Sequence, residues 1–182
     1  MSLFAFSASL RQGAWNTKLI ERAVAVAQEE GIEIELVDFR DLLCPWYDED
    51  VKNGEGFPPG ADLFRDLLTR HDGFLIASPE YNYSMPGALK NTIDWASRYR
   101  PSQPLAGKHA MLLSASPSMV GGNRGLWQLR QPLEVCGVHV HPEMFSLAVA
   151  HEAFDDDSQL ADPALAKRLR DAVVKFSGFA HR

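Results

Sequence analysis

Residues 3–37 read LFAFSASLRQGAWNTKLIERAVAVAQEEGIEIELV and divide into a strand, a loop, a helix and a second strand. The apolar run of residues 3–6 has no polar alternation, which is typical of a strand buried on both faces of a sheet. Residues 17–30 carry apolar side chains at the spacing of one helical face, namely Ile20, Ala23, Val24 and Ala27. Residues 32–37 alternate between apolar and charged and predict a strand nearer the sheet edge. This order of elements is typical of a βαβ unit with parallel strands.

The alternation of strands and helices continues along the chain. Further strands are predicted at residues 73–77, 110–113 and 138–140. Helical faces are predicted at residues 63–68, 87–98, 126–136 and 163–176. Residues 39–60 contain three prolines and three glycines and are predicted to form one long loop. Five strands alternating with five helices predict an α/β fold, in which a single domain over residues 1–182 has one parallel sheet with helices on both faces.

The composition is that of a folded globular domain. Apolar residues make up 46% and charged residues 23% of the 182 residues, which excludes disorder as the main state. The formal net charge of −6 argues against nucleic acid as a partner. Two cysteines are too few for a disulfide framework and indicate reduced thiols in a cytoplasmic protein. We expect neither a secretory signal nor a membrane partner, because the N-terminus lacks a basic region and no apolar run approaches the ~20 residues that span a bilayer.

A parallel sheet of this kind binds its ligand at the carboxyl ends of the strands, where the strand order switches. The predicted site is therefore built from the loops after the first, third and fourth strands, residues 7–15, 78–86 and 114–123. The first loop leads into a helix N-terminus, where free N–H groups and the helix dipole favour an anion. Ser9, Arg11 and Asn16 add side-chain donors that suit a phosphate monoester. The alternative is a plain turn with Asn16 as the N-cap and Arg11 in solvent.

The other two loops have a composition that suits a cofactor pocket. Residues 78–87, SPEYNYSMPG, are stiffened by two prolines and carry two tyrosines, so this loop could hold a flat heterocycle. Its alternative is a turn that caps the next helix through Ser84. Residues 114–124, SASPSMVGGNR, contain small residues that either let another molecule approach the backbone or form an ordinary flexible loop. The chain has neither the Gly-Lys-Ser/Thr of a P-loop nor the Gly-x-Gly-x-x-Gly of dinucleotide folds.

Together the three loops resemble the NADPH-dependent FMN reductase family, a flavodoxin-like group that includes quinone and chromate reductases. The resemblance spans most of the chain and is strongest in residues 79–94, PEYNYSMPGALKNTID, which are similar to the family's flavin-ring loop and following helix. The first loop is similar to the family's Gly-Ser-Leu-Arg-x-x-Ser-x-Asn phosphate loop, with Ala8 and Ala14 in place of the usual Gly and Ser. The resemblance implies a flavodoxin-like three-layer sandwich, whose five-stranded parallel sheet has the order 2-1-3-4-5.

The resemblance also implies a function and a set of FMN-binding residues. The residues expected to contact FMN are Ser9, Arg11 and Asn16 at the phosphate, Pro79, Glu80, Tyr81 and Asn82 at the isoalloxazine, and Ser116, Gly121 and Gly122 on the third side. We expect an NAD(P)H oxidoreductase in which hydride passes from NADPH or NADH through FMN to a small-molecule acceptor, which could be a quinone, a flavin, an azo compound or chromate. The flavin carries this chemistry, so no catalytic side chain is named, and Glu80 is expected to orient its loop.

Two other functions fit the same fold. A flavodoxin-type electron carrier would bind FMN without turnover of its own, but Arg11 and a net charge of only −6 argue against it, since such carriers have uncharged phosphate loops and strong acidity. A flavin-free protein that uses the fold for protein contacts would stay colourless after FMN addition. A metal site is not expected, because His139 and His141 lack a third ligand at a usual spacing.

An aromatic cluster indicates an oligomer. Its members lie in the second loop and in the helix over residues 87–98, and they are Tyr81, Tyr83, Met85, Trp95 and Tyr99. Aromatic and Met side chains are enriched at the cores of protein interfaces, although ordinary core packing explains them equally well. The resemblance implies a homodimer formed through this helix, or a homotetramer made of two dimers.

Overall fold

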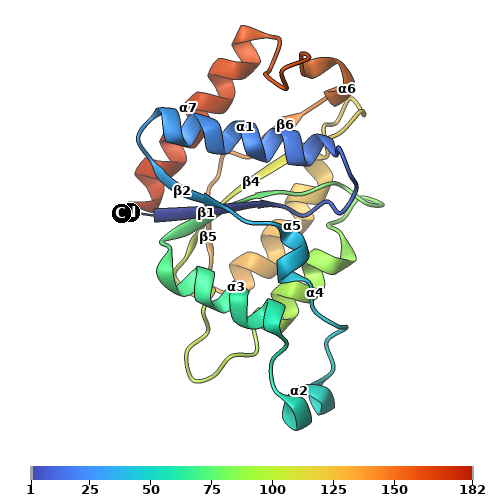
Figure 1. The fold of residues 1–182 in the computed structure, drawn as a ribbon, viewed down its shortest axis with the longest axis vertical. Helices are drawn as coiled ribbons and strands as arrows, with labels where there is room; N and C mark the ends of the chain where they lie inside the picture. The colour runs from blue at the N-terminus through green and yellow to red at the C-terminus, as the bar shows by residue number, and fades with distance from the viewer. Residues whose placement is uncertain (1, 182) are drawn as a thin grey trace.

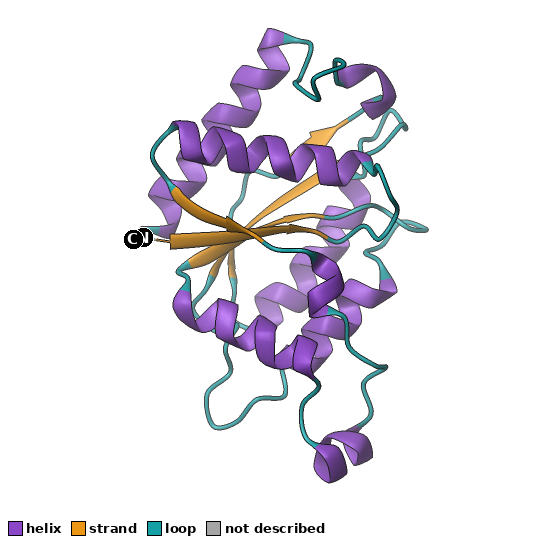
Figure 2. Ribbon diagram, viewed as in Figure 1, coloured by secondary structure: helices purple, strands orange, loops and turns teal. Residues whose placement is uncertain are grey.

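The computed structural model describes residues 2–181, in which a twisted sheet lies between two layers of helices (Figures 1 and 2). The strands are β1 (Ser2–Ser7), β2 (Glu33–Leu36), β3 (Gly73–Ala77), β4 (His109–Ala115), β5 (His139–Val140) and β6 (Phe145–Leu147). The helices are α1 (Trp15–Glu29), the 3-10 turn η1 (Phe39–Leu42), α2 (Glu49–Glu55), α3 (Pro59–Arg70), α4 (Gly87–Ala96), α5 (Asn123–Val135), α6 (Ala150–Ala153) and α7 (Pro163–Ala180). Neighbouring strands are parallel in the order β2-β1-β3-β4-β5, with β6 also paired to β4. The predicted flavodoxin-like order is confirmed.

Strand β1 lies inside the sheet and sends side chains into both helical layers. Leu3 and Ala5 belong to the core under α1 and α7. Phe4 and Phe6 belong to the core on the other face, under α3, α4 and α5, where each ring centre lies 6.1 Å from that of Phe64. The unbroken apolar run therefore marks a strand buried on both faces, as predicted. Because β1 pairs with both β2 and β3, its carboxyl end lies where the strand order switches.

The prediction that residues 39–60 form one loop is wrong, because they contain η1 and α2. Each of these elements begins at an aspartate that accepts a hydrogen bond from the backbone two residues later. The Arg40 N–H donates to Asp38 Oδ1 at 2.9 Å, and the Asp50 N–H donates to Asp48 Oδ1 at 2.8 Å. Helix α2 has no buried residue, so it carries no apolar periodicity from which it could have been predicted.

Two short elements near the C-terminal end were also missed. Strand β6 pairs with the carboxyl end of β4 over three residues, and α6 is a single turn of four residues. Both are shorter than the windows in which a periodic pattern is recognisable. Residues 2–181 thus contain six strands and seven α-helices, where the sequence predicted five of each. No helix within this range is both long and apolar enough to cross a membrane.

Helix α4 holds the segment that connects η1 to α2. The Asn91 Nδ2 donates to the carbonyls of Cys44 and Pro45 at 3.1 and 2.9 Å, and its Oδ1 accepts from the Tyr47 N–H at 2.8 Å. The Trp95 Nε1 donates to the same Pro45 carbonyl at 2.8 Å. The motif that follows the second loop therefore fixes a remote segment of the chain, a role that its sequence did not reveal.

The aromatic residues that were predicted to form an interface fall into a buried pair and an exposed pair. Trp95 is fully buried, and Tyr99 stacks on Phe57 with the ring centres 3.8 Å apart, so both side chains belong to the chain's own core. Their assignment to an interface between subunits is wrong, and the alternative of core packing holds for them. Tyr81 and Tyr83 are 51% and 63% exposed and remain available for a partner.

Candidate functional site

The loops after β1, β3 and β4 gather at the carboxyl edge of the sheet, on the right in Figure 1. A cavity of about 160 Å³ lies between them. Seven of the ten predicted FMN-binding residues line it, namely Ser9, Arg11, Asn16, Pro79, Glu80, Tyr81 and Ser116. Asn82, Gly121 and Gly122 lie outside this lining. The fold therefore brings the three predicted loops to one place.

The N-terminus of α1 opens into this cavity without a side-chain cap. Ala14 stands at the N-cap position, where its methyl group offers no hydrogen-bond acceptor, and the first turn contains no acidic residue. The Thr17 N–H donates to the Ala14 carbonyl at 3.0 Å, but the N–H groups of Trp15 and Asn16 have no acceptor among the described residues. They are therefore available to an anion, which the helix dipole also favours. The Ser9 hydroxyl and the Arg11 guanidinium come from the same cavity lining. This donor set fits the phosphate monoester of FMN.

Asn16 joins the first loop to the third. Its side chain is almost completely buried, with Nδ2 donating to the Ala115 carbonyl at 3.0 Å and Oδ1 accepting from the Ala115 N–H at 2.9 Å. The alternative in which Asn16 is the N-cap is wrong, because Ala14 occupies that position. An amide group has two N–H donors, so one remains for a ligand after the bond to Ala115.

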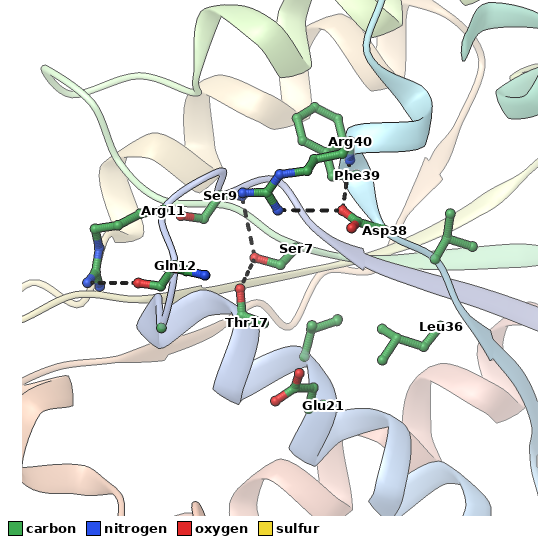
Figure 3. A pocket seen from close by; sticks show the side chains of 13 residues that line it. Ser7, Ser9, Arg11, Gln12, Thr17, Glu21, Leu36, Asp38, Phe39 and Arg40 are labelled. Atoms are coloured by element: carbon green, nitrogen blue, oxygen red, sulfur yellow. Dashed lines mark hydrogen bonds and ion pairs between the residues drawn. The ribbon is translucent and has the colours of Figure 1, made fainter. Parts of the chain in front are cut away.

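Arg11 is held only loosely by its own chain. Its Nη1 lies 3.5 Å from the neighbouring Gln12 carbonyl, at the outer limit of a hydrogen bond, and the side chain is exposed. In Figure 3 it points away from Ser7 and Thr17. The guanidinium is therefore free to turn towards a ligand.

The loop after β3 is a tight two-residue turn. Tyr81 and Ser84 exchange two backbone hydrogen bonds of 2.8 and 3.0 Å across Asn82 and Tyr83, whose φ angles are 51° and 68°. Two positive φ angles in succession are typical of a type I′ turn, which is unusual for a tyrosine. The guanidinium of Arg124 covers the Tyr83 ring at 3.8 Å. Helix α4 has no side-chain cap, so the alternative in which Ser84 caps it is wrong.

Glu80 ties this turn to the first residues of α5. Its carboxylate accepts hydrogen bonds from Arg124 Nε at 3.2 Å and from the Gly125 N–H at 3.0 Å. A Cβ atom at Gly125 would lie 3.1 Å from the Glu80 Cα, so the helix approaches the loop closely because it has a glycine here. A carboxylate beside a helix N-terminus is also favoured by the helix dipole. The contacts of Glu80 orient its loop against α5.

Gly121 and Gly122 serve the packing of the chain itself. Both have positive φ, 63° and 78°. A Cβ at Gly121 would lie 2.9 Å from the backbone of Leu147, and one at Gly122 would lie 2.0 Å from Ser114 Oγ. The Ser114 hydroxyl is buried, and it has no hydrogen-bond partner among the described residues. The space left by the two glycines is thus filled by β4 and by the end of β6.

A larger cavity, of about 390 Å³, lies beside the same first loop and reaches the end of β2 (Figure 3). It shares Ser9 and Arg11 with the smaller cavity. Ser7 Oγ accepts hydrogen bonds from the Ser9 N–H at 3.4 Å and from Thr17 Oγ1 at 3.3 Å. Arg40 reaches this cavity from η1.

Sequence reasoning missed Ser7, Thr17 and Arg40 as site residues. A signal for Arg40 was present, since it follows the second predicted strand and the carboxyl ends of parallel strands meet at one edge of the sheet. Arg124 belongs to the quoted third loop, but its position over Tyr83 depends on contacts between remote parts of the chain.

The thiols of Cys44 and Cys136 have raised pKa values, and His141 packs against aromatic rings of α7. Burial raises the pKa of the Cys44 thiol to about 11 and also raises that of Cys136, which disfavours the reactive thiolate. His141 is buried, and its ring centre lies 6.0 and 5.1 Å from those of Phe176 and Phe179. Residues 2–181 contain no group of three or more His, Cys, Asp or Glu that could hold a metal.

Comparison with known proteins assigns this geometry to a family. A family model described as NADPH-dependent FMN reductase matches residues 1–152, which include all three loops. The chain is 42% identical over 164 residues to the NAD(P)H-dependent FMN reductase of Pseudomonas aeruginosa, covering 89% of this chain and 85% of that protein. It is 40% identical over 185 residues to the probable NADPH:quinone oxidoreductase 2 of Oryza sativa subsp. japonica, covering 98% of this chain and 88% of that protein.

A solved structure agrees with these relatives. The chain superimposes with a TM-score of 0.86 on a flavoenzyme NAD(P)H:(acceptor) oxidoreductase from Paracoccus denitrificans. The two sequences are 27% identical, and the match covers 99% of this chain and 97% of that one. The similarity therefore extends over the whole fold, including the carboxyl edge of the sheet.

Proposed function

The chain belongs to the NADPH-dependent FMN reductase family and is an FMN-dependent NAD(P)H oxidoreductase; from this premise we propose that a quinone is its acceptor. The observation that carries the proposal is that an uncapped helix N-terminus and a stiff loop with an exposed tyrosine open into one cavity. This choice of acceptor is supported by a relative from Oryza sativa that is named as a probable NADPH:quinone oxidoreductase and by one from Escherichia coli that is named as a quinone reductase.

The chain's own residues have binding and orienting roles in this proposal. When FMN is bound, it supplies the chemistry that accepts hydride from NAD(P)H and passes it to the acceptor. Ser9, Arg11 and the first two N–H groups of α1, those of Trp15 and Asn16, hold the phosphate. The backbone of residues 79–82 borders the isoalloxazine, and Ser116 borders it from the third loop.

Tyr81 supports the choice of a flat acceptor. Its side chain lines the cavity and is 51% exposed, so an aromatic face is available at the cavity mouth. Aromatic rings pack well in offset or edge-to-face arrangements. A quinone ring can use this surface, whereas a compact oxyanion such as chromate gains nothing from it.

The test compares acceptors at fixed enzyme and NADPH concentrations. An absorbance spectrum of the purified protein first establishes its flavin content. We expect the highest kcat/KM with a quinone, followed by free FMN, an azo dye and chromate. A higher value for any other acceptor would overturn the proposal, and the absence of steady turnover with all four would favour an electron carrier.

The proposed assembly is a homodimer through the exposed aromatic residues beside the site. Tyr83 is 63% exposed, and Trp127 on α5 is 55% exposed. Arg124, one helical turn before Trp127, covers the Tyr83 ring, which places these side chains in one region. Exposed aromatic residues beside arginine are typical of interface cores. We further propose a cytoplasmic location, which both free cysteines support.

Light scattering tests the assembly. Trp127→Glu should shift the protein towards monomer at micromolar concentration. The matched control, Val174→Glu, also replaces an exposed apolar side chain, but on α7, and should leave the mass unchanged. A monomeric unsubstituted protein would exclude the dimer.

A further inference from the structure

Arg40 connects two elements that the chain places 30 residues apart. Its Nη2 donates to the Leu10 carbonyl at 2.7 Å, in the loop between β1 and α1. Among the described residues, no other hydrogen bond joins residues 10–13 to another element. The loop on which the proposed phosphate site depends is thus tied down from η1, and Figure 3 shows Arg40 and Ser9 among the side chains that line the larger cavity.

The base from which Arg40 extends is itself rigid. Its backbone N–H is bonded to Asp38 Oδ1 at 2.9 Å, and its Nη1 lies 3.8 Å from the same oxygen. The preceding residue, Phe39, is buried, and its ring stacks on that of Phe6 in β1 at 5.5 Å and 9°. The hydrogen bond to Leu10 therefore starts from a point anchored to the central strand.

Holding the Leu10 carbonyl also sets the direction of the next N–H group. The peptide between Leu10 and Arg11 is trans, because the only cis bond among the described residues precedes Pro101. In a trans peptide the C=O and the following N–H point in opposite directions. Because the Leu10 carbonyl faces Arg40, the Arg11 N–H faces away from Arg40. Arg40 lines the larger cavity and does not line the smaller one.

We propose that Arg40 is a positioning residue for the FMN phosphate, acting through the Leu10–Arg11 peptide. By fixing this peptide plane, Arg40 presents the Arg11 N–H to the side of the loop where the uncapped N-terminus of α1 opens. Preorganised backbone donors bind an anion more tightly because their ordering is not required at the moment of binding. This inference rests on the proposed phosphate site in the first loop.

The test separates the phosphate from the rest of the flavin. The full chain is loaded with FMN or with riboflavin, which lacks the phosphate, and is then diluted while the fluorescence of released flavin is recorded. The dissociation constant for riboflavin divided by that for FMN measures what the phosphate contributes to binding. Arg40→Met should lower this ratio about three- to tenfold by weakening FMN binding alone. This is less than the roughly tenfold or more that a whole hydrogen bond to a charged group contributes, because the Arg11 N–H remains and only its orientation is lost. Arg40→Lys, which keeps a donor of similar reach, should restore part of the ratio.

Arg100→Met is the matched control. Arg100 is also exposed and also donates to backbone carbonyls, those of Ser97 and Tyr99, but it lies beyond α4 and away from the first loop. Its replacement should leave the ratio unchanged. An unchanged ratio in Arg40→Met would overturn the inference. If the unsubstituted protein itself bound FMN and riboflavin equally, the proposed phosphate site would fail as well, so the two failures are distinguishable.

Hydrogen exchange distinguishes positioning from direct contact between Arg40 and the phosphate. In the riboflavin-loaded protein no phosphate is present, so only a positioning role makes the loop depend on Arg40. Amide exchange in residues 10–14 should be faster in Arg40→Met than in Arg100→Met. Equal exchange in the two variants would mean that Arg40 does not hold the loop, and the positioning role would be wrong.

Discussion

Asn16 and Ala115 are joined by two hydrogen bonds, from Asn16 Nδ2 to the Ala115 carbonyl at 3.0 Å and from the Ala115 N–H to Asn16 Oδ1 at 2.9 Å. The two residues are 99 positions apart in the chain. One side chain thus satisfies both polar groups of a buried peptide position at the end of β4 and fixes it against the start of α1. The start of α1, which follows the phosphate loop, is thereby joined to the start of the third loop.

Asn16→Ala is expected to lower the free energy of unfolding by about 2–3 kcal/mol, because it leaves the buried N–H and C=O of Ala115 without partners. Urea unfolding of the flavin-free protein measures this loss without the contribution of ligand binding. Asn16→Asp keeps the acceptor for the Ala115 N–H but places a carboxylate oxygen against the buried Ala115 carbonyl, so it should not recover the loss. If Asn16→Ala unfolded at the same urea concentration as the unsubstituted protein, these two hydrogen bonds would contribute nothing to the stability of the fold.

Arg11→Ala is expected to weaken FMN binding roughly ten- to a hundredfold, because a guanidinium can donate two charge-assisted hydrogen bonds to a phosphate. Riboflavin binding should be unaffected, since riboflavin has no phosphate. Flavin fluorescence titration measures both affinities, and excess FMN should restore turnover. Arg170→Ala, which removes a cation paired with Glu29 near the other end of α1, is the control. An unchanged FMN affinity in Arg11→Ala would place this side chain in solvent.

Gly122→Ala is expected to destabilise the protein by about 2–4 kcal/mol, through the strain of a left-handed backbone and the clash of the new methyl group. The φ angle is 78°, and the added Cβ would lie 2.0 Å from Ser114 Oγ and 3.0 Å from its Cβ. Adding Ser114→Ala removes the nearer atom and should recover part of the loss. By itself Ser114→Ala should be close to neutral, because its hydroxyl has no hydrogen-bond partner in the part of the chain that the structure describes.

Gly178→Ala provides the control for that prediction. Gly178 lies in α7, where an added Cβ would have no neighbour within 4 Å among residues 2–181. Alanine in place of a helical glycine should raise stability by about 0.5–1 kcal/mol. Thermal unfolding is measured for Gly122→Ala, Ser114→Ala, their combination and Gly178→Ala. The comparison separates the general effect of replacing a glycine from the specific contact between Gly122 and Ser114. Additive effects of Gly122→Ala and Ser114→Ala would exclude that contact as the cause.

Stability is expected to fall as the pH rises above about 9. Burial raises the pKa of Cys44 from 9.0 to about 11 in the folded protein, so between these values the unfolded chain loses a proton that the folded chain retains. Deprotonation then favours the unfolded state. Burial and the hydrogen bond to Asp62 also raise the pKa of Tyr99, which acts in the same direction at higher pH.

Urea midpoints measured from pH 7 to pH 10.5 test this dependence. Cys44→Ala should show a shallower decline between pH 9 and pH 10.5 than the unsubstituted protein, because the proton of this thiol no longer contributes. The slopes of urea midpoint against pH can be compared even if Cys44→Ala is less stable than the unsubstituted protein at every pH. Parallel curves for the two proteins would exclude Cys44 as a contributor.

The parallel sheet and the three site loops were predictable because they depend on short-range patterns. An apolar run such as residues 3–6 and a helical face such as that of residues 17–30 reflect burial of neighbouring positions. Glycines and prolines indicated where the loops lie. The strand order came from the family resemblance and not from periodicity. The same local signals failed in residues 39–60, where aspartate caps begin η1 and α2, and α2 has no buried residue.

The roles of several named residues depended on the tertiary structure alone. Asn16 resembled a phosphate donor or an N-cap until its bonds to Ala115 were seen, and Trp95 resembled an interface residue until its bond to Pro45 was seen. Arg40 had no predicted role. Their partners lie 99, 50 and 30 residues away in the chain. A single hydrogen bond over such a separation leaves no periodic pattern in the sequence, so only the folded chain brings its two partners together.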